Sequence, residues 1–170
     1  CAGFDVTMLD IKQEYVDRGI SSIEKSLAKL VSKERMTQQD ADAARARISS
    51  GIDRSVCADS DLVIEAVPEI LSLKIEIFEE LDQICKADCI LASNTSSISI
   101  TEIAAATNRA DKVIGMHFMN PVPIMKLVEI INGKETSEET NTAVIQASEK
   151  MGKIALSCND SPGFVSNRIL

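Results

Sequence analysis

The sequence is poor in aromatic residues and in basic charge, and both shortages limit what the protein can bind. Phe, Trp and Tyr make up 3% of the 170 residues, and tryptophan is absent. The formal net charge is −8, so we expect no nucleic-acid partner, because such a partner requires a basic face. No apolar run is long enough to cross a bilayer, so we expect no membrane association.

Secretion and metal binding also lack their usual sequence signals. The first ten residues, CAGFDVTMLD, contain neither a basic segment nor a signal-type cleavage site. The five cysteines are odd in number, and Cys85 and Cys89 have no second pair or histidine at zinc spacing. We therefore predict reduced thiols, no metal site and a cytoplasmic location.

Apolar residues are plentiful, at 45%, which is enough for one sizeable core. Short β-branched runs alternate with segments of helical periodicity along the chain. Strands are predicted at 4–9, 48–52, 61–67, 89–93, 113–116, 127–131 and 154–158. Helices are predicted at 12–33, 37–47, 70–84, 98–107, 137–152 and from 164 onward. This alternation predicts an α/β fold with a doubly wound, mainly parallel sheet.

Asp10, which follows the first predicted strand, is the first candidate binding residue. In a dinucleotide-binding βαβ unit, an acid at this place binds the adenosine ribose, about 20 residues after the first glycine of a Gly-x-Gly-x-x-Gly loop. We expect that loop to precede the chain, since Cys1-Ala2-Gly3 has the pattern of a helix C-terminus with its capping glycine. The alternative, which the residue alone favours, is an ordinary strand-end turn.

The segment 113–131 contains the only histidine, His117, between two short apolar runs. Each run is typical of a buried strand, and the second carries one acid, Glu129. A buried imidazole that faces a buried carboxylate is a general-base pair, because the acid fixes the tautomer and stabilises the charged ring. Taken alone, the residues favour the plainer alternative of a core histidine and a strand-end glutamate.

Two further features lie near the ends of the neighbouring strands. Lys74 comes early in the helix after Pro68-Glu69, where the helix dipole does not favour a cation. This position hints at function, whereas a solvent-exposed lysine is the commoner alternative. The run 94–97, Asn-Thr-Ser-Ser, follows the strand 89–93, and open α/β sheets bind ligands at such an edge. This run is either a capped loop or the floor of a site.

Four stretches of the sequence resemble one enzyme family. They are DLVIEAVPE (61–69), ILASNTSSISITEIAA (90–105), GMHFMNPVPIMKLVEII (115–131) and DSPGFVSNRIL (160–170). Their order and spacing resemble those of the L-3-hydroxyacyl-CoA dehydrogenases, most closely the 3-hydroxybutyryl-CoA dehydrogenases of bacteria. The resemblance implies a Rossmann-type NAD-binding domain over 1–159 that lacks its first strand. It also implies the start of a helical second domain at 160–170.

The resemblance further implies a reaction of fatty-acid metabolism and the residues that perform it. An L-3-hydroxyacyl-CoA is oxidised to the 3-oxoacyl-CoA with NAD, or the reverse reduction occurs. The matches to the general base, its orienting carboxylate, the serine on the reacting oxygen and the asparagine near the substrate carbonyl are His117, Glu129, Ser96 and Asn167. The matches to the cofactor cleft are Asp10, Glu69, Lys74, Ser96 and Asn120. For His117, the resemblance outweighs the plainer alternative.

The family's second domain closes the substrate cleft and forms the dimer, so the resemblance implies an acyl-CoA substrate and a homodimer. We expect the 170 residues alone to be inactive and unstable, because the strand between 4–9 and 61–67 would precede Cys1. Two alternatives stay open: a module of a multifunctional β-oxidation protein, and a non-catalytic NAD-binding relative. The four catalytic matches together favour an enzyme.

Overall fold

The computed structural model describes residues 2–169, with side-chain burial described as far as Arg168. Cys1 and Leu170, which the predictions for the two ends of the chain include, lie outside the described residues. The chain divides after Val56 into two compact units. Among the described helices, none has both the length and the apolar character needed to cross a membrane.

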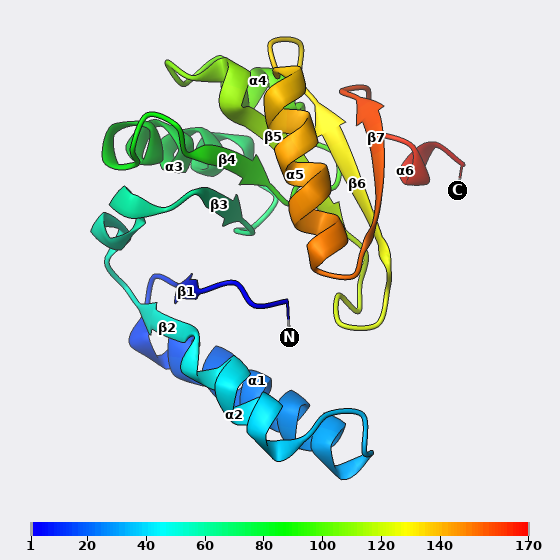
Figure 1. Ribbon diagram of the computed structural model, residues 1–170. Coiled ribbons are helices and arrows are strands. Elements are labelled where there is room, and N and C mark those ends of the chain that lie inside the picture. The colour runs from blue at the N-terminus through cyan, green and yellow to red at the C-terminus, as the bar shows by residue number, and fades with distance from the viewer. Residues whose placement is uncertain (1, 170) are drawn as a thin grey trace. The chain divides into compact units, whose positions relative to one another are not determined.

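The first unit consists of two parallel strands and two helices (Figure 1). In chain order its elements are β1 (Val6–Leu9), α1 (Gln13–Ser32), α2 (Gln38–Ala46) and β2 (Ile48–Gly51). The predicted start of the second helix is confirmed, because the Thr37 side chain accepts a hydrogen bond from the backbone N–H of Asp40. A small buried cluster, Leu27, Ala41 and Ala44, packs the helices together.

The second unit contains a five-stranded sheet with the order β3-β4-β5-β6-β7. Its strands are β3 (Leu62–Glu65), β4 (Ile90–Ser93), β5 (Val113–Phe118), β6 (Leu127–Asn132) and β7 (Ile154–Asn159). β3, β4 and β5 are parallel, β6 is antiparallel to β5, and β7 is parallel to β6. The predicted mainly parallel sheet is confirmed, with one antiparallel step inside it.

Helices and short turns precede, connect and follow the strands of this sheet. They are η1 (Arg54–Asp59), α3 (Leu71–Ile84), α4 (Ile100–Ala104), η2 (Ala110–Lys112), α5 (Glu138–Lys150) and α6 (Ser166–Ile169). The helix predicted from residue 164 begins two residues later, because Phe164 takes a left-handed φ of 49°. Ser137 caps α5 as predicted, since its side chain accepts a hydrogen bond from the Thr140 N–H.

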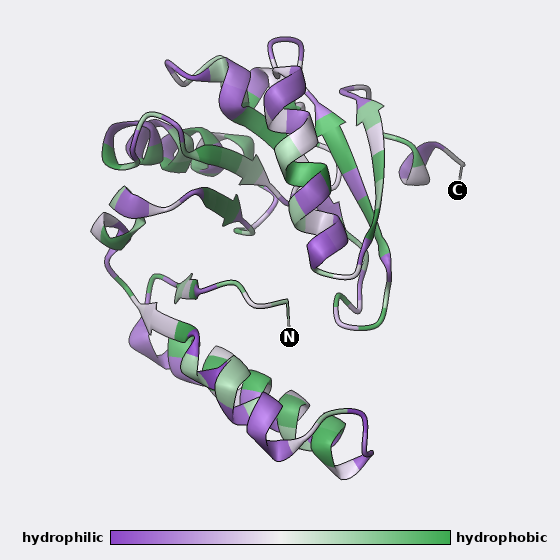
Figure 2. Ribbon diagram, in the orientation of Figure 1, coloured by the Kyte–Doolittle hydropathy of each residue, from purple (hydrophilic) through white to green (hydrophobic). Residues whose placement is uncertain are grey.

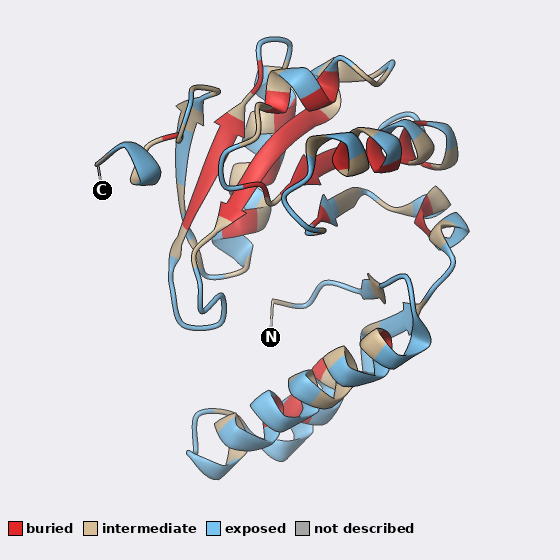
Figure 3. Ribbon diagram, turned by 180° about the vertical axis from the view of Figure 1, so that it is seen from behind, coloured by how far each residue is buried: buried red, intermediate tan, exposed pale blue. Residues whose placement is uncertain are grey.

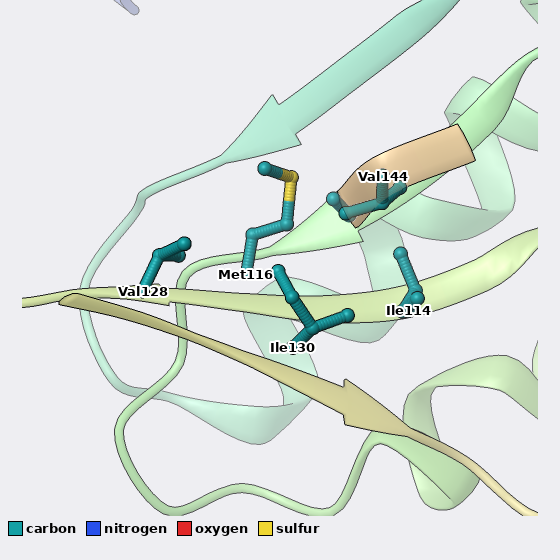
Figure 4. Close-up of a cluster of buried hydrophobic side chains, with 6 residues drawn as sticks. Ile114, Met116, Val128, Ile130 and Val144 are labelled. Atoms are coloured by element: carbon teal, nitrogen blue, oxygen red, sulfur yellow. The ribbon is translucent and has the colours of Figure 1, made fainter. Parts of the chain in front are cut away.

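The residues of β5 and β6 alternate between two buried faces. One face packs against α5, where Figure 4 shows Ile114, Met116, Val128 and Ile130 gathered with Val144. Figure 2 shows these strands as mostly hydrophobic, with hydrophilic positions on β6, and Figure 3 shows them as buried. The core of the second unit therefore lies at the middle of its sheet.

The opposite face of the same strands lies against α4. A Cβ added to Gly115 would lie 2.8 Å from the Cβ of Ile131 and 3.1 Å from the Cδ1 of Ile100. The missing side chain thus permits a close approach of β5, β6 and α4. Because side chains alternate, His117 and Glu129 belong to this α4-facing side of the sheet.

Candidate active site

The centre of the candidate site is a hydrogen bond between the only histidine and a buried carboxylate. His117 lies on β5 and Glu129 on β6, with 2.8 Å between His117 Nδ1 and Glu129 Oε2. The Glu129 side chain is fully buried, whereas the His117 side chain is 10% exposed. The structure therefore brings together the two residues that the sequence analysis pairs.

The antiparallel step between β5 and β6 produces this contact. His117 and Glu129 are direct partners in the register, and directly opposite residues place their side chains on one face. Gly115 and Ile131 form the next pair on that face. The strand register, and not a loop, fixes the distance between the imidazole and the carboxylate.

The Glu129 carboxylate is held in its ionised form. Burial works to raise the pKa of Glu129, but hydrogen bonds from His117 and Ser166 outweigh it and leave that pKa below its ordinary value. An ionised carboxylate only accepts hydrogen bonds, so the proton of the contact belongs to His117 Nδ1. The acceptor nitrogen of the neutral ring is then Nε2, which makes no hydrogen bond within the described residues.

A bent segment before α6 completes the surroundings of Glu129. The backbone N–H groups of Val165 and Ser166 donate to its Oε1 at 3.2 and 2.7 Å, and the Ser166 hydroxyl donates to Oε2 at 2.9 Å. Gly163 and Phe164 both have left-handed φ values, 76° and 49°. This bend also sets the Phe164 ring against the His117 ring, with 6.1 Å between centroids.

Lys74 is enclosed in a second polar cluster at the ends of β3 and β4. Its ammonium lies 2.8 and 3.0 Å from the two oxygens of Glu65 and 3.3 Å from the carbonyl of Val67. The side chains of Lys74 and Glu65 are 1% and 2% exposed. The solvent-exposed alternative for Lys74 is therefore wrong, because the helix turns this cation toward a buried carboxylate. The Ser93 hydroxyl donates to the same carboxylate at 2.6 Å.

Glu69 links this cluster to the polar run after β4. Its Oε2 is 3.5 Å from the Lys74 ammonium, and its Oε1 accepts from the Thr95 hydroxyl at 2.5 Å. The backbone N–H groups of Ser96 and Ser97 donate to the same Oε1 at 2.9 and 3.1 Å. Burial tends to raise the pKa of Glu69, but these donors and Lys74 lower it overall. The carboxylate thereby holds the 95–97 loop in place.

Ser96 and Asn167 meet although they are far apart in the sequence. The Asn167 side-chain amide donates to the Ser96 carbonyl at 2.9 Å. Asn167 follows Ser166, which binds Glu129, so α6 contacts both polar clusters. Four of the predicted site residues, His117, Glu129, Ser96 and Asn167, thus belong to one connected region of the second unit.

The remaining predicted residues have simpler surroundings. Asp10 is exposed in the first unit, where its Oδ1 accepts from the Ile11 N–H at 2.7 Å, as in an ordinary turn. Its Oδ2 makes no hydrogen bond within the described residues. Asn120 is exposed between β5 and β6 and precedes Pro121 through a cis peptide bond. The cofactor roles of both residues stay predictions.

Two residues of the site are missing from the sequence-based set. Glu65 holds Lys74, and its signal was present, since an acid inside the apolar run 62–67 is unusual. Ser166 carries no such signal, because a small polar residue at a helix start has many ordinary explanations. Only the folded chain shows that its hydroxyl reaches Glu129.

The fold and the site together define a dinucleotide-binding α/β domain with a buried histidine–glutamate pair. A family model described as "3-hydroxyacyl-CoA dehydrogenase, NAD binding domain" matches residues 1–161. The chain belongs to this family, whose cofactor is NAD. The predicted domain boundary at 159 stays a prediction.

Individual relatives agree with this assignment. The chain is 53% identical over 169 residues to a probable 3-hydroxybutyryl-CoA dehydrogenase of Deinococcus radiodurans, covering 99% of this chain and 60% of the relative. It is 42% identical to the fatty acid oxidation complex subunit alpha of Psychrobacter arcticus, covering 99% of this chain and 23% of that protein. A crystal structure of (S)-3-hydroxybutyryl-CoA dehydrogenase from Ralstonia eutropha matches with a TM-score of 0.96 and 46% identity, covering 99% and 59%. The chain thus spans about 60% of the length of these two 3-hydroxybutyryl-CoA dehydrogenases.

Proposed function

We propose that this chain is the NAD-binding part of an enzyme that oxidises L-3-hydroxyacyl-CoA, such as 3-hydroxybutyryl-CoA, to the 3-oxoacyl-CoA, or catalyses the reverse. The observation that carries the proposal is the 2.8 Å contact between His117 and Glu129, in which Nε2 faces away from the carboxylate and stays unpaired in the described chain. Membership of the dehydrogenase family supports it.

His117 serves as the general base of the proposed reaction. The substrate hydroxyl gives its proton to Nε2 while the hydride leaves carbon 3, so the products are a carbonyl and an imidazolium. NAD, when bound, supplies the hydride acceptor. The charge that appears on His117 is matched by Glu129, which is already ionised and only 2.8 Å from Nδ1.

Ser96 and Asn167 orient the substrate in this proposal. The Ser96 hydroxyl binds the reacting oxygen, and Asn167 holds the region of the substrate carbonyl. The support is their direct contact, since the Asn167 amide donates to the Ser96 carbonyl at 2.9 Å. Both residues are exposed, so a ligand has access to them.

The acceptor oxygens of the chain fit the hydroxyl groups of NAD. The Glu69 side chain is 39% exposed, so a carboxylate already fixed by the 95–97 loop can accept from a ribose. Asp10 and Asn120 are exposed and have polar atoms to offer. Lys74 is enclosed at 1% exposure, so in this proposal it acts on the cofactor site by holding Glu69.

The test is an assay of the full-length protein with L-3-hydroxybutyryl-CoA and NAD, followed by the absorbance of NADH. We expect turnover with the L isomer, none with the D isomer, and a higher kcat/KM for NADH than for NADPH in the reverse direction. Asp10 would repel the 2′-phosphate of NADPH. An absence of turnover with both isomers would instead favour a non-catalytic NAD-binding relative.

A second candidate is the dehydrogenase module of a multifunctional fatty-acid oxidation protein. The 42% identity to a fatty acid oxidation complex subunit supports it, whereas the higher identity to the Deinococcus relative favours a single-function enzyme. The mass of the intact polypeptide separates the two. The proposal also includes a homodimer formed through the second domain and a cytoplasmic location, to be tested by light scattering and by cell fractionation.

A further inference from the structure

One oxygen of Glu129 is shared between the histidine and a serine. Oε2 accepts from His117 Nδ1 at 2.8 Å and from the Ser166 hydroxyl at 2.9 Å. The other oxygen accepts from the backbone N–H of Ser166 at 2.7 Å. A change at the Ser166 side chain therefore alters one donor to Oε2 and leaves the backbone donor in place.

The position of the Ser166 hydroxyl is imposed by the segment that carries it. Phe164 is buried, with 2% exposure, and its left-handed φ of 49° turns the chain so that residues 165 and 166 face Glu129. A bulky residue in this conformation is uncommon and needs support from its packing. The hydroxyl is thus held at the carboxylate by the fold around it.

We propose that Ser166 is a positioning residue of the dehydrogenase reaction: its hydroxyl competes with His117 for Oε2 of Glu129 and so limits how strongly the carboxylate holds the imidazolium. This inference rests on the proposed function. A carboxylate oxygen spreads its charge over the donors that it accepts. Without the hydroxyl, Oε2 interacts with His117 alone and stabilises the protonated ring more.

The elements around Glu129 carry other ionisable groups. Those on the neighbouring elements are Glu102 on α4, Cys158 on β7, Asp160 after β7 and Arg168 on α6. Burial, with the charges of Glu129 and Asp160, raises the pKa of the Cys158 thiol, so it is uncharged near neutral pH. Asp160 is held by Ser99 and the Thr101 N–H. Because alanine and threonine carry no ionisable group, Ser166→Ala and Ser166→Thr change no charge at the site.

The test uses Ser166→Ala, Ser166→Thr and the control Ser161→Ala in the full-length protein. Ser161 lies in the same segment, and its hydroxyl contacts the Asn159 carbonyl instead of Glu129. Two titrations are measured: the pH dependence of kcat, and the NMR ring signal of His117, identified by its loss in His117→Asn. We expect Ser166→Ala to move both midpoints upward by about 0.5 to 1 pH unit, as for the loss of one hydrogen bond to a carboxylate.

Ser166→Thr keeps a hydroxyl and should keep the parent midpoints, and so should Ser161→Ala. If Ser166→Ala fails to fold, Ser166→Cys, a weak donor of similar size, should show an upward shift of both midpoints. An unchanged NMR midpoint in folded Ser166→Ala, or in Ser166→Cys where it replaces Ser166→Ala, overturns the inference, and so does an equal shift in Ser161→Ala. If the parent protein shows no turnover but Ser166→Ala still shifts the NMR midpoint, the result supports the contact and contradicts the proposed function. The two failures are therefore distinguishable.

Discussion

The second unit contains two polar clusters, each built on a buried carboxylate, with Glu65 at the end of β3 and Glu129 inside β6. In the Lys74 cluster, the ammonium is surrounded by two oxygens of Glu65, a carbonyl and Glu69, and its side chain is 1% exposed. In the His117 cluster, the carboxylate is equally buried but its partner is 10% exposed and keeps one nitrogen unpaired among the described residues.

The difference lies in what each cluster leaves available. A buried ion pair whose hydrogen bonds are all made inside the protein contributes to a specific structure, and removing one partner is costly. A buried carboxylate that holds one side of an accessible imidazole leaves the other side free for proton transfer. We therefore expect substitutions in the Lys74 cluster to act mainly on stability, and those in the His117 cluster mainly on turnover.

The largest effect should come from His117→Ala. Removal of a general base lowers kcat by roughly 10²–10⁴-fold, while the affinity for NAD should barely change because the ring serves the substrate oxygen. The measurements are kcat of the full-length protein and a titration with NAD. Near-normal turnover of this variant would contradict the proposed catalytic role of His117. It would also contradict the expected difference between the two clusters.

The next effect concerns the enclosed ion pair. Lys74→Ala leaves Glu65 as an unpaired buried charge, so the free energy of unfolding should fall by about 3–5 kcal/mol. Lys86→Ala is the matched control, because Lys86 pairs with Asp61 at 2.6 Å on the surface, where solvent screens the pair, and it should leave the free energy of unfolding almost unchanged. Urea unfolding measures both, and equal losses in the two variants would contradict the distinction.

A smaller effect on turnover should follow from Glu129→Gln. The imidazolium then lacks its counter-charge, and the loss of a hydrogen bond to a charged group lowers kcat by roughly 10- to 100-fold. Asp82→Asn is the control, since Asp82 is a buried carboxylate that binds Arg109 at 2.7 Å, away from the histidine. A loss of kcat in the control as large as that in Glu129→Gln would mean that general destabilisation, and not the pairing with His117, slows the enzyme.

The smallest effect is a decline of stability in acid that involves both clusters. Glu69 and Glu129 have pKa values below the ordinary 4.5, so the unfolded chain binds protons that the folded chain does not. Their contribution is complete above pH 4.5 and is lost as the pH falls through the lower folded values. Urea midpoints measured from neutral pH down to below 4.5 should decrease, and the decrease should be weaker in Glu129→Gln.

Local patterns in the sequence account for most of the fold. The strand and helix periods, and the capping residues Thr37 and Ser137, depend on neighbours within a few positions and were predictable. The sequence also indicates the antiparallel direction of β6 through the length of the connection before it. The connection 119–126 is too short for a crossover, since parallel strands need a dozen or more residues.

Contacts between distant segments had no such signal. Glu65 is conspicuous as an acid in an apolar run, but neither that run nor the helical pattern around Lys74 reveals that the two side chains meet. The bond from the Asn167 amide to the Ser96 carbonyl joins residues 71 positions apart, and only packing brings them together. The family resemblance supplied the names of the predicted site residues, but neither it nor the local pattern supplied the contact of Ser166 with Glu129.

The antiparallel ladder also has a consequence for how such a domain can diversify. The pairing of His117 with Glu129 depends on the register of β5 and β6 and not on the residues that connect them. The connection exposes Val122, Ile124 and Met125, which take no part in that ladder. Side chains at 122–125 can therefore change while His117 and Glu129 keep their spacing, whereas added residues would disturb the carbonyls of Val122 and Met125 that accept from Lys153. The connection thus offers a changeable surface beside a pair of side chains that the strand register holds in place.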